Sequence, residues 1–132
     1  MENLYIKEEK CTPEISLNLD GTISLVGRSY PENTLEFYKP MMEWLEKYFE
    51  LPLSHKTIFN MEIIYFNSSS SKLFFDLFDL LEEYSNNNDI EINWIYDEEN
   101  DNAEEAGEYF IEDFENLNIN LIVKEELNCE NE

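Results

Sequence analysis

The residues with the clearest chemical potential are a run of small polar side chains, Asn67-Ser68-Ser69-Ser70-Ser71-Lys72. The run follows the apolar segment Ile58 to Phe66 and precedes the amphipathic segment Lys72 to Tyr84. Serine and asparagine at such a junction cap a helix, because their side chains accept hydrogen bonds from the free N–H groups of its first turn. The same N–H groups and the helix dipole also favour a phosphate. Local chemistry alone leaves both interpretations open.

A phosphoryl group on one of these hydroxyls would add about two negative charges at the start of the helix. Lys72 is the only cation adjacent to the run in sequence. New charge on a docking surface can block or create a contact through electrostatics alone, without refolding. The run therefore predicts a regulated hydroxyl as well as a helix start.

Two other places carry residue types that are used in catalysis. His55 is the only histidine, and no obvious partner accompanies it, so we expect a surface residue rather than a base. The acidic stretch Asp97 to Asp101 offers oxygen ligands for Mg²⁺ or Ca²⁺, but it lacks the spacing of a calcium loop, and we expect a solvated turn. No glycine-rich nucleotide-binding pattern is present. The sequence thus predicts no catalytic residue, metal or cofactor, and a small metal-dependent enzyme using Asp97 to Asp101 is the alternative.

The elements that position these residues follow from hydrophobic spacing. Alternating or continuous apolar segments predict five strands, at 14–19, 23–27, 57–66, 90–96 and 119–123. Helical spacing predicts three helices, at 33–51, 72–84 and 103–114. Asn33 or Glu32 is expected to cap the first helix. Asp20-Gly21 predicts a turn between the first two strands, and their alternation is typical of a hairpin at the edge of a sheet.

The resulting order, β-β-α-β-α-β-α-β, predicts a single α/β domain with a mixed, mostly parallel sheet and an N-terminal β-hairpin. Apolar residues in both alternation sets of the segment 57–66 predict a central strand covered on both faces. Sites in such sheets lie beyond the carboxyl ends of the strands, where the serine run and the acidic stretch both fall. We expect the domain to span 13–124, between a poorly ordered segment 1–12 and an acidic tail 125–132.

Composition limits the class of partner. The chain has 132 residues, 42% of them hydrophobic, which is enough to bury a core. Its net charge of −23 disfavours nucleic acids and anionic membranes, although an acidic mimic that binds a basic protein stays open. Cys11 and Cys129 form no zinc pattern. No signal peptide or membrane span is apparent, so a cytoplasmic location is expected.

Three segments carry a family resemblance: Thr12 to Ile15, Gly27 to Asn33 and Tyr65 to Lys72, with weaker matches at Asn93 to Glu98 and Glu105 to Glu108. Together they resemble the SiaC-like bacterial regulatory phosphoproteins, over about 12–123. Gly27-Arg28-Ser29-Tyr30-Pro31-Glu32-Asn33 is the most specific match. The serine run is also similar to the phosphoserine loop of anti-anti-sigma factors with the STAS fold.

The resemblance implies a non-enzymatic, partner-switching regulator with a STAS-like fold. A cognate Ser/Thr kinase would phosphorylate a hydroxyl in the loop before the second helix, and a PP2C-type phosphatase would reverse it. The unmodified protein would bind and activate a diguanylate cyclase, in cyclic di-GMP signalling. By position, the acceptor is Ser68, with Ser69 as runner-up. Asn67, Ser70, Ser71 and Lys72 would form the phosphate loop and helix N-terminus. Four residues of the segment Gly27 to Asn33 match the family, but the resemblance implies no acceptor or catalytic role for them. They belong either to a partner surface or to a rigid connector: Arg28, Ser29, Tyr30 and Glu32.

Overall fold

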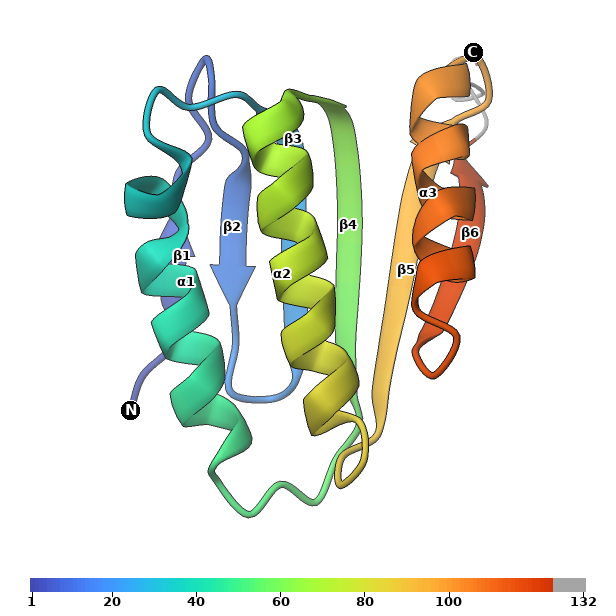
Figure 1. The fold of residues 1–132 in the computed structure, drawn as a ribbon. Helices are drawn as coiled ribbons and strands as arrows, with labels where there is room; N and C mark the ends of the chain where they lie inside the picture. The colour runs from blue at the N-terminus through green and yellow to red at the C-terminus, as the bar shows by residue number, and fades with distance from the viewer. Residues whose placement is uncertain (125–132) are drawn as a thin grey trace, which may run out of the picture.

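The computed structural model describes residues 1–124, which form a six-stranded sheet and three helices (Figure 1). The strands are β1 (Leu4–Ile6), β2 (Glu14–Leu17), β3 (Thr22–Ser29), β4 (Thr57–Phe66), β5 (Ile90–Asp97) and β6 (Asn118–Lys124). The helices are α1 (Thr34–Phe49), α2 (Ser68–Tyr84) and α3 (Asp101–Asp113). Within residues 1–124, no helix has the length and apolar character needed to cross a membrane. The expected acidic tail, 125–132, and Cys129 lie outside the described residues.

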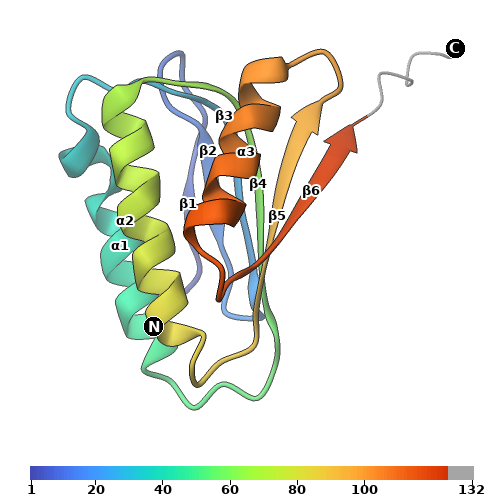
Figure 2. The same ribbon diagram turned by 45° about the vertical axis from the view of Figure 1, so that its right-hand side comes forward.

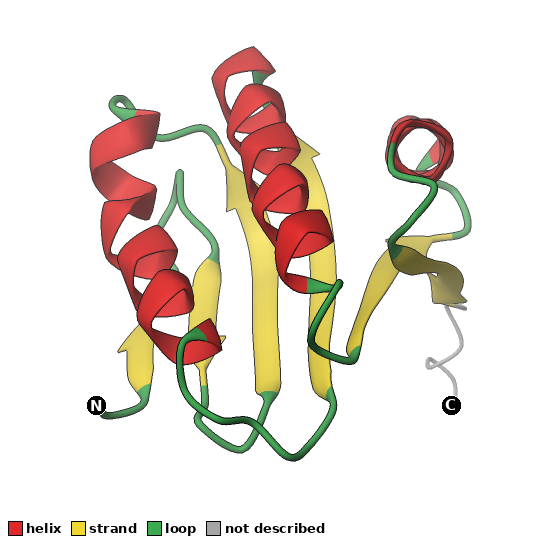
Figure 3. Ribbon diagram, turned by 60° about the horizontal axis from the view of Figure 1, so that its bottom comes forward, coloured by secondary structure: helices red, strands yellow, loops and turns green. Residues whose placement is uncertain are grey.

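The strands lie side by side in the order of the sequence. β1, β2 and β3 pair antiparallel, whereas β3, β4, β5 and β6 pair parallel. One helix joins each parallel pair. Right-handed crossovers that all advance in the same direction put their helices on the same face of a sheet, and Figure 3 shows the three helices together on one side. The predicted α/β fold, with its mixed sheet and N-terminal hairpin, is confirmed.

The prediction that the central strand is covered on both faces is wrong. Alternate residues of β4 are buried beneath the helices: Thr57, Phe59, Met61 and Ile63. The residues between them face the other side of the sheet and are partly exposed: Ile58, Asn60 and Glu62. No helix of residues 1–124 covers that side (Figure 3). The sheet therefore has one helix-covered face and one open face.

The N-terminal segment contains a strand that the sequence pattern missed. β1 pairs with β2, with Leu4 opposite Leu17, inside the segment 1–12 that we expected to be poorly ordered. A strand of three residues is too short to display alternation, so periodicity does not detect it. Because β1 forms the edge of the sheet, the predicted edge position of the β2–β3 hairpin is also wrong. The expected turn is present, with Gly21 at φ +99°.

α3 lies close against the far end of the sheet because of one glycine. A Cβ atom at Gly107 would overlap the side chain of Leu121 and the indole ring of Trp94. The Trp94 indole N–H donates to the carbonyl of Ala103 at 2.8 Å, and its ring packs edge-on against Phe110. The family-like segment Glu105 to Glu108 thus has a packing role.

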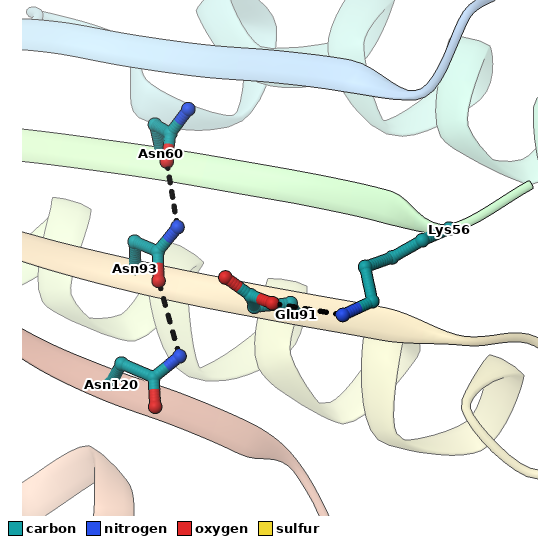
Figure 4. Close-up of polar contacts among 5 residues, drawn as sticks. All are labelled: Lys56, Asn60, Glu91, Asn93 and Asn120. Atoms are coloured by element: carbon teal, nitrogen blue, oxygen red, sulfur yellow. Dashed lines mark hydrogen bonds and ion pairs between the residues drawn. The ribbon is translucent and has the colours of Figure 1, made fainter.

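A ladder of asparagines crosses the open face of the sheet (Figure 4). The amide of Asn93 on β5 donates to Asn60 on β4 at 2.9 Å and accepts from Asn120 on β6 at 3.2 Å. Beside it, Lys56 forms an ion pair with Glu91 at 3.1 Å. These side chains satisfy one another across three strands, which suits a face that no helix of residues 1–124 covers.

Candidate functional site: the start of helix α2

The serine run forms the first turn of α2 instead of a loop. The helix begins at Ser68, four residues earlier than the predicted start at Lys72. Asn67 is the N-cap, since its side-chain oxygen accepts from the N–H of Ser70 at 2.9 Å and its carbonyl accepts from the N–H of Ser71 at 2.9 Å. Serine is a weak helix former, so periodicity alone placed the start too late. The capping interpretation is confirmed.

The four serines differ sharply in exposure. Ser68 and Ser69 are exposed and Ser71 is partly buried, whereas Ser70 has 0% of its surface accessible. The N–H groups of Ser68 and Ser69 donate to no group among residues 1–124, and the first turn carries no acidic side chain. These groups provide a place where a negative charge is favoured. Of the two exposed hydroxyls, Ser68 lies at the first helical position.

Ser70 belongs to a buried network of hydroxyl groups. Its Oγ donates to the Ser29 carbonyl at 2.9 Å and lies 2.7 Å from Ser29 Oγ, which lies 2.6 Å from the hydroxyl of Tyr38. Every hydroxyl of the network has an acceptor if Tyr38 donates to Ser29 Oγ, Ser29 donates to Ser70 Oγ, and Ser70 donates to the Ser29 carbonyl. Burial raises the pKa of Tyr38 to about 12, while the hydrogen bond with Ser29 acts in the opposite direction. The network joins the end of β3, α1 and the start of α2.

The four residues of the family-like segment that have no assigned role differ in their exposure to solvent. Ser29 is inaccessible, so it belongs to the connector and not to a partner surface. Tyr30 is half-buried and packs edge-on against Tyr65, with ring centroids 5.7 Å apart. Arg28 and Glu32 are exposed. Of the four residues, these two side chains are free to meet a partner.

A groove of about 430 Å³ separates the N-terminal turns of α1 and α2. Its walls include Glu32, Leu35, Ser69, Lys72 and Asp76. Leu35 is 72% exposed at its edge. The groove lies at the carboxyl end of the parallel strands, as expected for a site in this class of sheet.

The acidic stretch has a structural role in the region that the structure describes. Asp97 caps a turn by accepting from the N–H of Glu99 at 2.9 Å, and Asn100 caps α3 through the N–H of Ala103 at 3.1 Å. Among residues 1–124, no three His, Cys, Asp or Glu side chains come together as metal ligands would. His55 is exposed, and its Nε2 lies 3.0 Å from the hydroxyl of Tyr48.

Comparison with known proteins identifies the group to which this architecture belongs. A family model described as SiaC family regulatory phosphoprotein matches residues 6–124. The chain belongs to the SiaC family. An uncharacterised protein of Pseudomonas aeruginosa strain UCBPP-PA14 is 33% identical over 118 residues, covering 86% of this chain and 90% of its own.

Solved structures of SiaC proteins share the fold. The crystal structure of apo-SiaC from Pseudomonas aeruginosa superposes with a TM-score of 0.81 at 27% identity, covering 92% of this chain and 99% of that one. A chain in the crystal structure of the diguanylate cyclase SiaD in complex with its activator SiaC, also from Pseudomonas aeruginosa, gives a TM-score of 0.84 at 29% identity, with the same coverage. The SiaC family of regulatory phosphoproteins and its fold were thus identified correctly from the sequence.

Proposed function

We propose that this protein is a non-enzymatic signalling regulator, switched by reversible phosphorylation of Ser68, that binds a downstream effector in a phosphorylation-dependent way. The observation that carries the proposal is the contrast within one helical turn. Ser68 is exposed at the first position of α2, while Ser70, two residues further on, is fully buried. A kinase can reach the first hydroxyl without disturbing the network that holds the helix.

The start of α2 favours a phosphate at this position. The N–H groups of Ser68 and Ser69 donate to no group among residues 1–124, and the first turn of α2 carries no acidic side chain. Lys72 lies four residues after Ser68, which is the spacing at which opposite charges on a helix meet. A phosphate on Ser68 would change the charge of the surface, while Asn67 and Ser70 keep the helix start in place.

The effector that we propose is a diguanylate cyclase. The support comes from the family: a SiaC protein of Pseudomonas aeruginosa forms a complex with the diguanylate cyclase SiaD as its activator. A cognate Ser/Thr kinase and a PP2C-type phosphatase would complete the switch. In this scheme, the protein contributes surfaces and one acceptor hydroxyl but no catalytic group.

Mass spectrometry tests the acceptor. We expect incubation with its cognate Ser/Thr kinase and ATP to add one phosphoryl group to the wild type and to Ser69→Ala, but none to Ser68→Ala. Ser71→Ala is the matched control from the same turn. A phosphoryl group that persists in Ser68→Ala would transfer the assignment to another hydroxyl, and no phosphorylation of the wild type would refute the switch.

Calorimetric titration tests the effector. Unmodified and phosphorylated protein are titrated into diguanylate cyclases of the same organism, and cyclic di-GMP production is followed in parallel. We expect one form to bind at least tenfold more tightly than the other. Equal affinity of the two forms would contradict phosphorylation-dependent binding.

A further inference from the structure

The sheet divides where β4 and β5 stop pairing. Their parallel register ends at Met61 opposite Trp94, yet β4 continues to Phe66 and β5 continues to Asp97. Beyond this point β4 stays paired with β3, and β5 stays paired with β6. Figures 1 and 2 show β5 running away from β4 towards its carboxyl end. Two backbone edges inside the sheet therefore face each other without pairing.

A β-bulge accompanies this separation. The register between β3 and β4 slips by one residue after Gly27, which pairs with Ile63, while Arg28 pairs with Tyr65. Ile64 is the extra residue, and its carbonyl accepts from the side chain of Asn100 at 3.0 Å. Gly27 has φ +132°, a conformation that favours glycine. A bulge bends and twists its strand, and this bulge lies on the part of β4 that no longer pairs with β5.

The opening forms a cavity of about 440 Å³, which we name the fork notch. Its lining includes Glu62, Ile64, Ile95, Asp97, Glu99 and Lys124. The aliphatic side chains of Ile64 and Ile95 provide apolar walls, and Ile64 is 45% exposed. Lys124 is the cation of the lining, and its ammonium group is paired with Glu62 at 2.7 Å. The rim therefore carries an excess of negative charge around an apolar centre.

We propose that the fork notch is a docking site for a partner protein, and that it receives an aliphatic side chain of the partner that is flanked by lysine or arginine. An apolar pocket with a charged rim has the arrangement of an interface centre, where a few buried side chains provide most of the affinity. The rim carboxylates select basic neighbours by charge complementarity. A second copy of this chain is disfavoured as the occupant because each copy carries a net charge of −23.

The notch also adjoins the proposed phosphorylation site. A second hollow, of about 240 Å³, shares Ile64 and Asn100 with it and extends to Phe66, two residues before Ser68. The two hollows together thus reach from the notch to the end of β4, which leads directly into α2. This inference rests on the proposed function only in identifying the partner as the effector.

A model peptide tests the notch independently of any effector. An amphipathic helical peptide of leucine and lysine is titrated into ¹⁵N-labelled protein, and amide shifts are followed by NMR. We expect the largest shifts at Ile64, Ile95 and Asn100, and at least tenfold weaker binding by Ile64→Asp. Added salt should weaken binding to the wild type, because it screens the attraction of the rim carboxylates for lysine, and Glu99→Lys should bind more weakly than the wild type at low salt. Amide shifts that change only at residues outside the notch would overturn the inference.

Matched controls lie at the opposite end of α3. Ile111 is 37% exposed, so Ile111→Asp introduces the same change outside the notch, and Glu112→Lys matches Glu99→Lys. Both controls should bind the peptide as the wild type does. Concentration-dependent self-association that Ile64→Asp abolishes would identify a second copy as the occupant and overturn the proposal.

The same variants, titrated into the diguanylate cyclase, separate this inference from the proposed function. A wild type that binds the peptide at the notch but no cyclase would refute the proposed function and leave the notch supported. A cyclase that binds Ile64→Asp and the wild type equally well would overturn the notch as the effector's site, while the proposed function would stand.

Discussion

The Oγ atoms of Ser29 and Ser70 lie 2.7 Å apart inside the protein, although the two residues are 41 positions apart in the sequence. Ser29 ends β3, and Ser70 lies in the first turn of α2. Tyr38 of α1 completes the connection through its hydroxyl. Three elements are thus joined by hydrogen bonds two residues beyond the proposed acceptor, so we expect a modification of Ser68 to change the charge of the surface without displacing these elements.

Removing the Ser70 hydroxyl should destabilise the fold. Ser70→Ala removes one of the two donors to the Ser29 carbonyl, which keeps the N–H of Asn67 at 3.1 Å. It also leaves the Ser29–Tyr38 pair with one buried O–H that has no acceptor in the network, so we expect the free energy of unfolding to fall by about 1–3 kcal/mol. Ser69→Ala, one residue earlier and exposed, should change it by less than about 0.5 kcal/mol. Urea denaturation followed by circular dichroism measures both. Equal stabilities of the two variants would argue against the network.

Stability should fall in alkaline solution through Tyr38. Its pKa is raised from 10.0 to about 12, mainly by burial. A group with a higher pKa in the folded state contributes stability below its unfolded pKa, and this contribution is lost as the pH rises through the folded value, here from pH 10 to about 12. The loss approaches about 1.4 kcal/mol per pH unit.

Tyr38→Phe removes this titration. Urea denaturation between about pH 9 and pH 11 should give a shallower decrease in the free energy of unfolding for Tyr38→Phe than for the wild type. Tyr109→Phe, which changes an exposed tyrosine on α3, is the control and should follow the wild type. A wild-type slope unchanged by Tyr38→Phe would assign the alkaline loss to other groups.

The asparagine ladder should contribute to holding β4, β5 and β6 together. Asn93→Ala removes the hydrogen bonds to Asn60 and Asn120, and we expect a loss of about 1–2 kcal/mol in the free energy of unfolding. Thermal and urea unfolding measure it. Asn118→Ala, an exposed position on β6, is the matched control. If both variants have the same free energy of unfolding, the ladder does not contribute to stability.

The sequence predicted the order of the main elements because their apolar residues recur at the spacing of helices and strands. The prediction of burial failed where the packing of other elements determines which face of a strand is covered. The pattern predicted Ile58 and Ile64 to be covered by a second layer, but they lie on the open face. The bulge at Ile64 returns Phe66 to the helix-covered side, where it packs against Phe74. Polar Asn60 and Asn93, in the middle of central strands, were the overlooked signal of an open face.

The site was only partly predictable. Position within a serine run says nothing about which hydroxyl is accessible, because burial of Ser70 depends on Ser29 and Tyr38. Ser29, read as a possible partner residue, is buried for the same reason. The fork notch arises from strand register, which no local pattern reveals.

A phosphate on Ser68 should stabilise the protein through the start of α2. The helix dipole and the ammonium of Lys72 both favour it, and we expect a gain of about 0.5–1 kcal/mol at low ionic strength. Lys72→Gln should lose part of that gain, whereas Lys39→Gln, an exposed lysine of α1, should keep it. Added salt should diminish the gain, because exposed charges are screened. Thermal unfolding of unmodified and phosphorylated protein measures each difference. A phosphorylated form that is less stable at every salt concentration would mean that the helix start does not hold the phosphate, and that repulsion from the many carboxylates dominates instead.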